Sequence, residues 1–211
     1  MNVSIQDQLA HSLDRRDQGP NRELAERIIN KGGAAQLQEL VDFFLTQPDK
    51  NLQKDCVLTM AWVGELSPEM LVPHVDLLLG NFNSEIPRVV WGSMIALAFS
   101  ANLVPDQIYK ALPEIIDTMD AGTPVTRDHG YRMLITLYQT EKYREDVFYI
   151  ILEQIQLAPS NQLGQYAEKL IKVLDTKHKK ELIVVLEDRS AELTNEHHKK
   201  RLGKNLKKLY K

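Results

Sequence analysis

An apolar helical segment recurs along the chain at a nearly constant spacing, and this repeat constrains the fold more than any other feature of the sequence. Four segments align on their apolar residues: KDCVLTMAWVGEL from Lys54, RVVWGSMIALAFS from Arg88, RDHGYRMLITLYQ from Arg127 and GQYAEKLIKVLDT from Gly164. Their first residues lie 34, 39 and 37 positions apart. A period of this length is typical of chains built from stacked copies of one supersecondary unit.

Each aligned segment is followed by a second predicted helix, over 68–79, 105–119, 144–157 and 177–187. Apolar residues recur at i, i+3 and i+4, and no alternating β-branched run between turn signals predicts a strand. One helix pair cannot bury its apolar stripe alone, whereas stacked pairs form a continuous core whose ends need polar caps. We therefore expect an all-α fold, a solenoid of stacked antiparallel helix pairs.

The two-helix unit resembles the repeats of the HEAT/armadillo-like superfamily. The resemblance covers about four helix pairs over 49–189, preceded by divergent N-terminal helices over 1–46 and followed by a basic C-terminal capping helix over 192–211. It implies a right-handed α-α superhelix (solenoid) and a single α-solenoid domain over 1–211. The fourth segment departs from the pattern, because Gly164 stands where the other three begin with a basic residue.

The formal charge of −3 is unevenly distributed along the chain. Residues 196–211 contain seven Lys or Arg and one acidic residue, so the remainder is acidic. Leu202, Leu206 and Leu209 fall at i, i+4 and i+7, which favours a capping helix with one packed side. A nucleic-acid or anionic-lipid contact of this tail is the alternative. It would use Lys199, Lys200, Arg201, Lys204, Lys207 and Lys208.

The single cysteine, Cys56, excludes a disulfide framework and a cysteine-based metal cluster. It lies in an apolar-periodic segment, so we expect a small buried side chain. The N-terminal residues lack a basic region followed by a continuous apolar run, and no uncharged run is long enough to cross a bilayer. We expect a cytoplasmic protein without a membrane span.

Motifs for catalysis are missing from the sequence. The six histidines lack the i, i+3 or i, i+4 spacing of helical metal pairs, and the His-Glu dipeptides of HEAT-type iron hydroxylases do not occur. Nor does the chain contain a P-loop, a dinucleotide-binding glycine motif or a nucleophile elbow. We expect no catalytic residue, no metal and no cofactor.

Trp62 and Trp91 are the aromatic residues to weigh as ligand-stacking groups. In the alignment, the position of Trp91 is taken by smaller residues, above all by Gly130 in the next segment. Because close packing favours large against small side chains, we expect Trp91 to be a core residue that fills the room left by Gly130. Gly92 beside it permits a close helix approach. For Trp62, which lies on a less apolar face, burial and exposure both stay open.

The second helices of stacked pairs usually line the concave binding surface of such folds. Outward positions of the helices predicted over 105–119 and 144–157 are Glu114, Asp117, Tyr149 and Glu153. An acidic surface with a tyrosine favours a basic or mixed protein partner over a nucleic-acid groove, where Lys and Arg should dominate. The alternative is that these four residues form a solvent-exposed face without a binding role.

The sequence thus predicts a non-enzymatic HEAT-like scaffold for protein–protein interaction. The alternative is a nucleic-acid-binding protein of the HEAT-like alkylpurine DNA glycosylase kind, which the shared architecture, the two tryptophans and the basic tail would support. Such an enzyme needs exposed aromatic residues and a carboxylate in a basic groove. A third possibility is self-association with a second copy of the chain, through the second helices or the tail.

Overall fold

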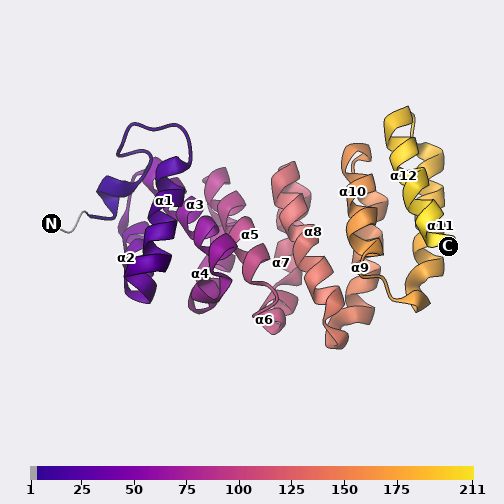
Figure 1. Cartoon of the computed structure of the whole chain (residues 1–211), viewed down its shortest axis with the longest axis horizontal. Helices are drawn as coiled ribbons and strands as arrows, with labels where there is room; N and C mark the ends of the chain where they lie inside the picture. The colour runs from indigo at the N-terminus through magenta and orange to yellow at the C-terminus, as the bar shows by residue number, and fades with distance from the viewer. Residues whose placement is uncertain (1–3) are drawn as a thin grey trace. The chain divides into compact units, whose positions relative to one another are not determined.

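A computed structural model of the chain describes residues 4–211, and all regular secondary structure within that range is helical (Figure 1). The predicted all-α class is therefore confirmed. The α-helices are α1 (Gly19–Arg27), α2 (Gly33–Thr46), α3 (Lys50–Leu66), α4 (Val75–Gly80), α5 (Pro87–Ser100), α6 (Pro105–Lys110), α7 (Leu112–Ala121), α8 (Pro124–Gln139), α9 (Arg144–Leu157), α10 (Ser160–Ile171), α11 (Lys179–Glu192) and α12 (Glu196–Leu209). Shorter helical turns are η1 (Gln6–Gln8), η2 (Ile28–Gly32), η3 (Pro68–His74), η4 (Asn81–Asn83), η5 (Glu141–Tyr143) and η6 (Thr176–His178).

Two of the predicted second helices are interrupted by proline. The segment predicted over 68–79 begins as the 3₁₀ turn η3 and becomes α-helical only at Val75, after Pro73. The segment predicted over 105–119 breaks at Ala111, and Pro113 lies in the first turn of α7. A proline has no N–H for the preceding turn, so each helix restarts beside it. The helix predicted over 177–187 is longer than expected, since α11 continues to Glu192.

Contacts within the chain define two compact units, which divide between Met133 and Leu134 inside α8. In the first unit α3 packs between α1 and α5, and α2 also contacts α3. Fully buried side chains at this contact include Leu24 of α1, Met60 of α3 and Leu97 of α5. The single domain predicted over 1–211 stays a prediction.

Gly92 allows the close approach of α3 and α5. A Cβ atom at Gly92 would lie 2.7 Å from Cγ1 of Val57, which is closer than packed carbon atoms approach. The close approach predicted for Gly92 is therefore confirmed. Ser93 and Ala96 on the same helix are also fully buried, so small residues make much of the contact surface of α5.

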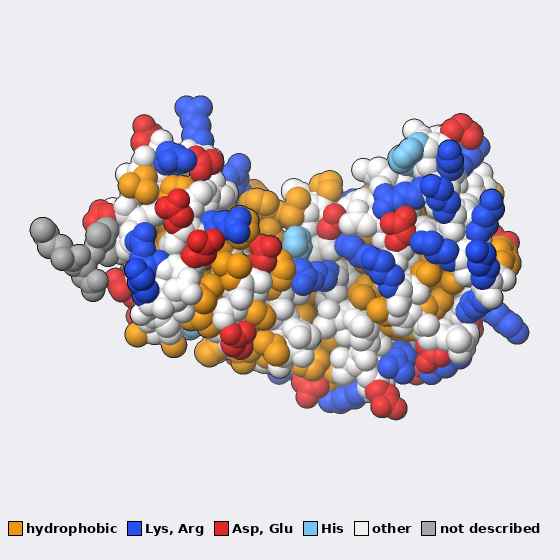
Figure 2. All heavy atoms as spheres, viewed as in Figure 1, with side chains coloured by type: hydrophobic (Ala, Val, Ile, Leu, Met, Phe, Trp, Pro, Cys, Tyr) orange, Lys and Arg blue, Asp and Glu red, His pale blue; other side chains and the backbone are white. Residues whose placement is uncertain are grey.

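In the second unit, α12 packs on both α10 and α11. Asn195 caps the helix, because its side-chain oxygen accepts hydrogen bonds from the backbone N–H groups of His197 and His198. Leu202 and Leu209 are buried, whereas Lys207 and Lys208 are exposed. The buried side and the solvent-exposed side predicted for this helix are confirmed. Figure 2 shows Lys and Arg side chains gathered over α10 and α12.

A buried polar cluster joins the α8 end of the second unit to the start of α11. The hydroxyl oxygen of Tyr138 accepts a 2.8 Å hydrogen bond from the backbone N–H of Asp175 and lies 3.0 Å from Nδ1 of His178. The imidazole of His178 stacks on Phe148, with ring centroids 3.8 Å apart. These contacts fix the loop that contains η6.

Candidate functional site

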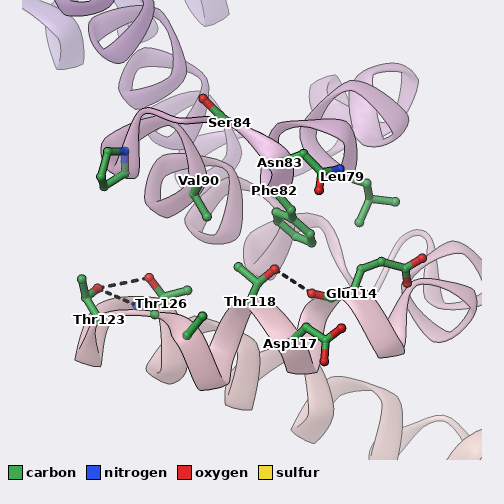
Figure 3. A pocket seen from close by; sticks show the side chains of 13 residues that line it. Leu79, Phe82, Asn83, Ser84, Val90, Glu114, Asp117, Thr118, Thr123 and Thr126 are labelled. Carbon is green, nitrogen blue, oxygen red and sulfur yellow. Dashed lines mark hydrogen bonds between the residues drawn. The ribbon is translucent and has the colours of Figure 1, made fainter.

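The acidic hollow is a surface depression of about 600 Å³ in the first unit (Figure 3). Its lining residues are Leu79, Phe82, Asn83, Ser84, Pro87, Val90, Glu114, Asp117, Thr118, Ala121, Gly122, Thr123 and Thr126. Among these residues there are two carboxylates and no Lys or Arg. The hollow therefore combines negative charge with an apolar wall from the α4 to α5 region.

The acidic side of the hollow comes from α7. Glu114 and Asp117 are three residues apart and share one side of that helix, while Ile115 and Met119 are buried on the other. The hydroxyl of Thr118 donates a 2.6 Å hydrogen bond to the backbone carbonyl of Glu114, as Figure 3 shows. The structure thus brings two of the four predicted partner-binding residues together.

The other two predicted residues, Tyr149 and Glu153, lie one helical turn apart on α9 in the second unit. Tyr149 is 60% exposed and Glu153 is exposed. The Tyr149 ring contacts that of Phe148 edge-on, at 5.4 Å between centroids. The four predicted residues therefore form two pairs, one in each unit.

A second depression, the aromatic groove, has a volume of about 280 Å³ and an almost wholly apolar lining. It is lined by Gln18, Leu58, Ala61, Trp62, Glu65, Trp91, Ile95, Phe99 and His129. These residues come from α3, α5 and α8 and from the residue before α1. Both tryptophans of the chain lie in this groove, and both are only half-buried.

The predicted role of Trp91 as a core residue is wrong. The room at Gly130 is filled by methionines, since a Cβ atom there would lie 2.2 Å from Cγ of Met119 and 3.0 Å from Cε of Met94. Because Gly92 and its small neighbours face α3, the large ring of Trp91 is left at the margin of the helix contact. His129, which precedes Gly130 in the third aligned segment, is also half-buried at the groove.

Cationic side chains cover the edges of the aromatic groove. The guanidinium of Arg22 lies 5.1 Å from the ring centroid of Trp62, and that of Arg132 lies 4.2 Å from the centroid of Phe99. Both distances are within the range of cation–π attraction. Burial lowers the pKa of Arg132, and the nearby carboxylate of Glu65 partly opposes that change. The guanidinium still remains charged at neutral pH.

A third depression, the basic hollow, was missed by the sequence analysis. It has a volume of about 810 Å³ and is lined by His11, Asp14, Arg15, Arg16, Gln18, Lys50, Asn51, Lys54, Asp55, Ile86, Pro87 and Arg88. Its cations come from three separate segments, so no basic run marks it in the sequence. The one sequence signal for this hollow was the basic residue at the start of each of the first two aligned segments, Lys54 and Arg88.

Cys56 is fully buried, as predicted, and burial raises the pKa of its thiol to about 12. A thiol with that pKa supplies almost no thiolate at neutral pH. Among residues 4–211, no group of three or more His, Cys, Asp and Glu is placed to hold a metal ion. Within the same range, none of the helices combines the length and the apolar character that crossing a membrane requires.

Comparisons with known proteins give one structural likeness. No family model matches the chain, and no curated protein matches its sequence. Among solved structures, the chain is similar to an engineered protein determined by the Northeast Structural Genomics Consortium, with a TM-score of 0.62 and 16% identical residues. The match covers 98% of this chain and 99% of that one. At this identity the likeness concerns the fold alone.

Proposed function

We propose that the chain is a non-enzymatic, HEAT/armadillo-like interaction protein of the cytoplasm, whose helix pairs stack into a right-handed α-solenoid. Its acidic hollow binds a basic segment of a partner protein. The observation that supports this function is the position of Glu114 and Asp117 in one hollow whose lining contains no Lys or Arg. Tyr149 and Glu153 on α9 remain predicted as further contacts of the same partner.

The chemistry of the hollow indicates what kind of segment it accepts. A Lys or Arg side chain has an apolar stem and a charged end, so its stem can lie on Leu79 and Phe82 while the charge approaches Asp117. Exposed charge pairs add modest affinity, but they speed association and exclude acidic competitors. The expected ligand is therefore a short segment in which Lys or Arg alternates with apolar residues.

A peptide library tests this assignment. The wild-type protein should retain peptides rich in Lys or Arg with apolar neighbours, and fluorescence anisotropy should show about a tenfold loss of affinity in the Glu114→Gln, Asp117→Asn double variant. Asp120→Asn is the matched control, because Asp120 is exposed on the same helix and does not line the hollow. If the wild type and the double variant select the same peptides with equal affinity, the acidic hollow is not the binding surface.

A second candidate function is a HEAT-like alkylpurine DNA glycosylase, and the half-exposed tryptophans of the aromatic groove favour it. Such an enzyme needs a carboxylate beside its aromatic residues, and Glu65 lines the same groove. Duplex DNA containing N7-methylguanine should then release the free base, and Glu65→Gln should abolish release while Glu69→Gln should not. Intact substrate after incubation with the wild-type protein would exclude this activity.

A further inference from the structure

The basic hollow contains more positive charge than its own carboxylates neutralise. Five Lys or Arg line it, against two Asp. One of these, Asp55, is buried, accepts a 2.7 Å hydrogen bond from the backbone N–H of His11 and lies 3.8 Å from Nζ of Lys54. That carboxylate is therefore already used within the fold.

Three of the cations in the basic hollow have no acidic partner in the described part of the chain. Arg16, Lys50 and Arg88 are exposed, and within the described chain none of them has a carboxylate oxygen within 4.0 Å. Arg15 differs, because its guanidinium pairs with Asp17 at 2.8 Å. The hollow thus presents positive charge that an anionic ligand could neutralise.

Helix α3 connects the basic hollow to the aromatic groove. Lys50 and Lys54 line the hollow, and Leu58 and Trp62 follow on the same side of the helix at i, i+4 spacing. Trp62 lies twelve positions after Lys50, which corresponds to about 18 Å along the helix. Gln18 lines both depressions, so they adjoin each other.

Helix α5 repeats this order beside α3. Arg88 in its first turn lines the basic hollow, and Trp91, Ile95 and Phe99 line the groove at spacings of three and four residues. The two helices pack against each other. Together they form a track, defined here as the basic hollow plus the aromatic groove, with cations at one end and half-exposed aromatic rings at the other.

We infer that this track binds a single-stranded nucleic acid, with phosphates at Arg16, Lys50 and Arg88 and bases stacked on Trp91 and Trp62. Cations that follow a backbone and aromatic rings that accept bases are the two parts of such sites. In an undistorted double helix the bases are already stacked on each other, so they are not available to the tryptophans unless one leaves the stack. An acidic peptide would satisfy the cations without requiring the rings.

The tryptophans provide a direct measurement. Because the chain has two tryptophans and both lie in the groove, intrinsic tryptophan emission reports on this site alone. Oligo(dT) and oligo(U) of about eight nucleotides should quench it, and comparing the two distinguishes DNA from RNA. With three phosphates neutralised, log K should fall with log salt at a slope of about −2. Polyglutamate should bind more weakly and leave the emission unchanged.

Variants separate this site from the basic tail. Anisotropy of a labelled oligonucleotide should show about a tenfold loss of affinity for Trp91→Leu and for Lys50→Glu combined with Arg88→Glu. Lys207→Glu with Lys208→Glu makes the same charge change on α12 and should have no effect. Circular dichroism checks that each variant is folded. The binding of basic peptides to the acidic hollow is a separate measurement, so either proposal can fail alone.

Three outcomes would overturn the inference. One is unchanged tryptophan emission with every oligonucleotide at low salt. Another is equal affinity for duplex and single-stranded DNA, which would indicate a duplex ligand. Quenching by polyglutamate equal to that by the oligonucleotides would likewise indicate an acidic protein. The last is a loss of binding in the α12 variant while the Lys50 and Arg88 variant binds normally, which would place the contact on the tail.

Discussion

In the unit up to Met133 the contact of α3 with α5 is made by apolar and small residues, whereas in the unit from Leu134 polar side chains link α10 to α12 and α8 to the start of α11. In the first unit, α3 and α5 meet at Gly92, and cations such as Arg88 stay at the surface with no acidic partner among residues 4–211. In the second, Tyr138 and Arg201 form hydrogen bonds between elements. Polar side chains thus join these elements of the second unit, whereas the contact of α3 with α5 in the first leaves Arg88 available for a ligand.

The link between α10 and α12 explains an irregularity of the repeat. Nε and an Nη atom of Arg201 donate hydrogen bonds of 2.9 and 2.7 Å to the carboxylate of Glu168, and Asn205 donates to the backbone carbonyl of Gly164. A Cβ atom at Gly164 would lie 2.7 Å from Cδ of Arg201. The basic residue that opens the other segments is therefore replaced by glycine where α12 crosses.

The largest effect is expected from removing an apolar side chain of the first unit. Leu97→Ala leaves a cavity at the fully buried face of α5 and should lower the free energy of unfolding by about 2–5 kcal/mol. Urea titration measures the change, and Leu157→Ala, at a 64% exposed position, should change it by less than about 0.5 kcal/mol.

Cys56 on the adjacent helix offers a second readout of the same variant. Its buried thiol should react with an alkylating reagent at pH 8 only after local opening, so labelling should be faster in Leu97→Ala than in the wild type. Equal losses of stability at positions 97 and 157 would contradict the assignment of α5 to the core.

An intermediate effect is expected from the polar cluster of the second unit. Tyr138→Phe removes the hydroxyl that bonds the Asp175 N–H and the His178 imidazole, and leaving buried partners unsatisfied should cost about 1–3 kcal/mol. Thermal unfolding measures this loss against Tyr149→Phe, which alters an exposed ring and should be neutral. If Tyr138→Phe left the stability unchanged, this polar cluster would not stabilise the second unit.

The smallest effect is expected from the pair that joins α10 and α12. Hydrogen bonds from Arg201 hold the pKa of Glu168 below its usual value of 4.5. The depressed pKa makes the contribution present above about pH 4.5 and lost as the pH falls through the folded pKa. The pair is one-third exposed, so Glu168→Gln should cost about 0.3–1 kcal/mol at pH 7.

Urea titrations of the wild type and Glu168→Gln, run from pH 7 to pH 3, test this dependence. The difference between them should shrink toward zero below about pH 4.5, because the wild-type carboxylate then becomes protonated. A difference that is constant over this range would show that packing, and not the charge of Glu168, accounts for the loss. Glu153→Gln on an exposed face of α9 serves as the control.

The helical class, the interhelical close approach at Gly92 and the shared face of Glu114 and Asp117 could all be predicted, because helical periodicity is a local property of the sequence. The burial of Trp91 could not. The alignment ranked positions by the size of their apolar residues, yet the small residues Gly92 and Ala96 of α5 lie at its contact with α3. The larger ring was thereby left at a groove.

The sequence by itself determined that the chain is helical, at what spacing its apolar segments recur and which end of the chain is basic. Only the tertiary structure decided that cations from separate segments, Arg16, Lys50 and Arg88, gather in one hollow, and that the hollow continues into the groove of both tryptophans. The physical reason is that spacing along one helix fixes which of its residues share a side, whereas packing between helices fixes which sides adjoin.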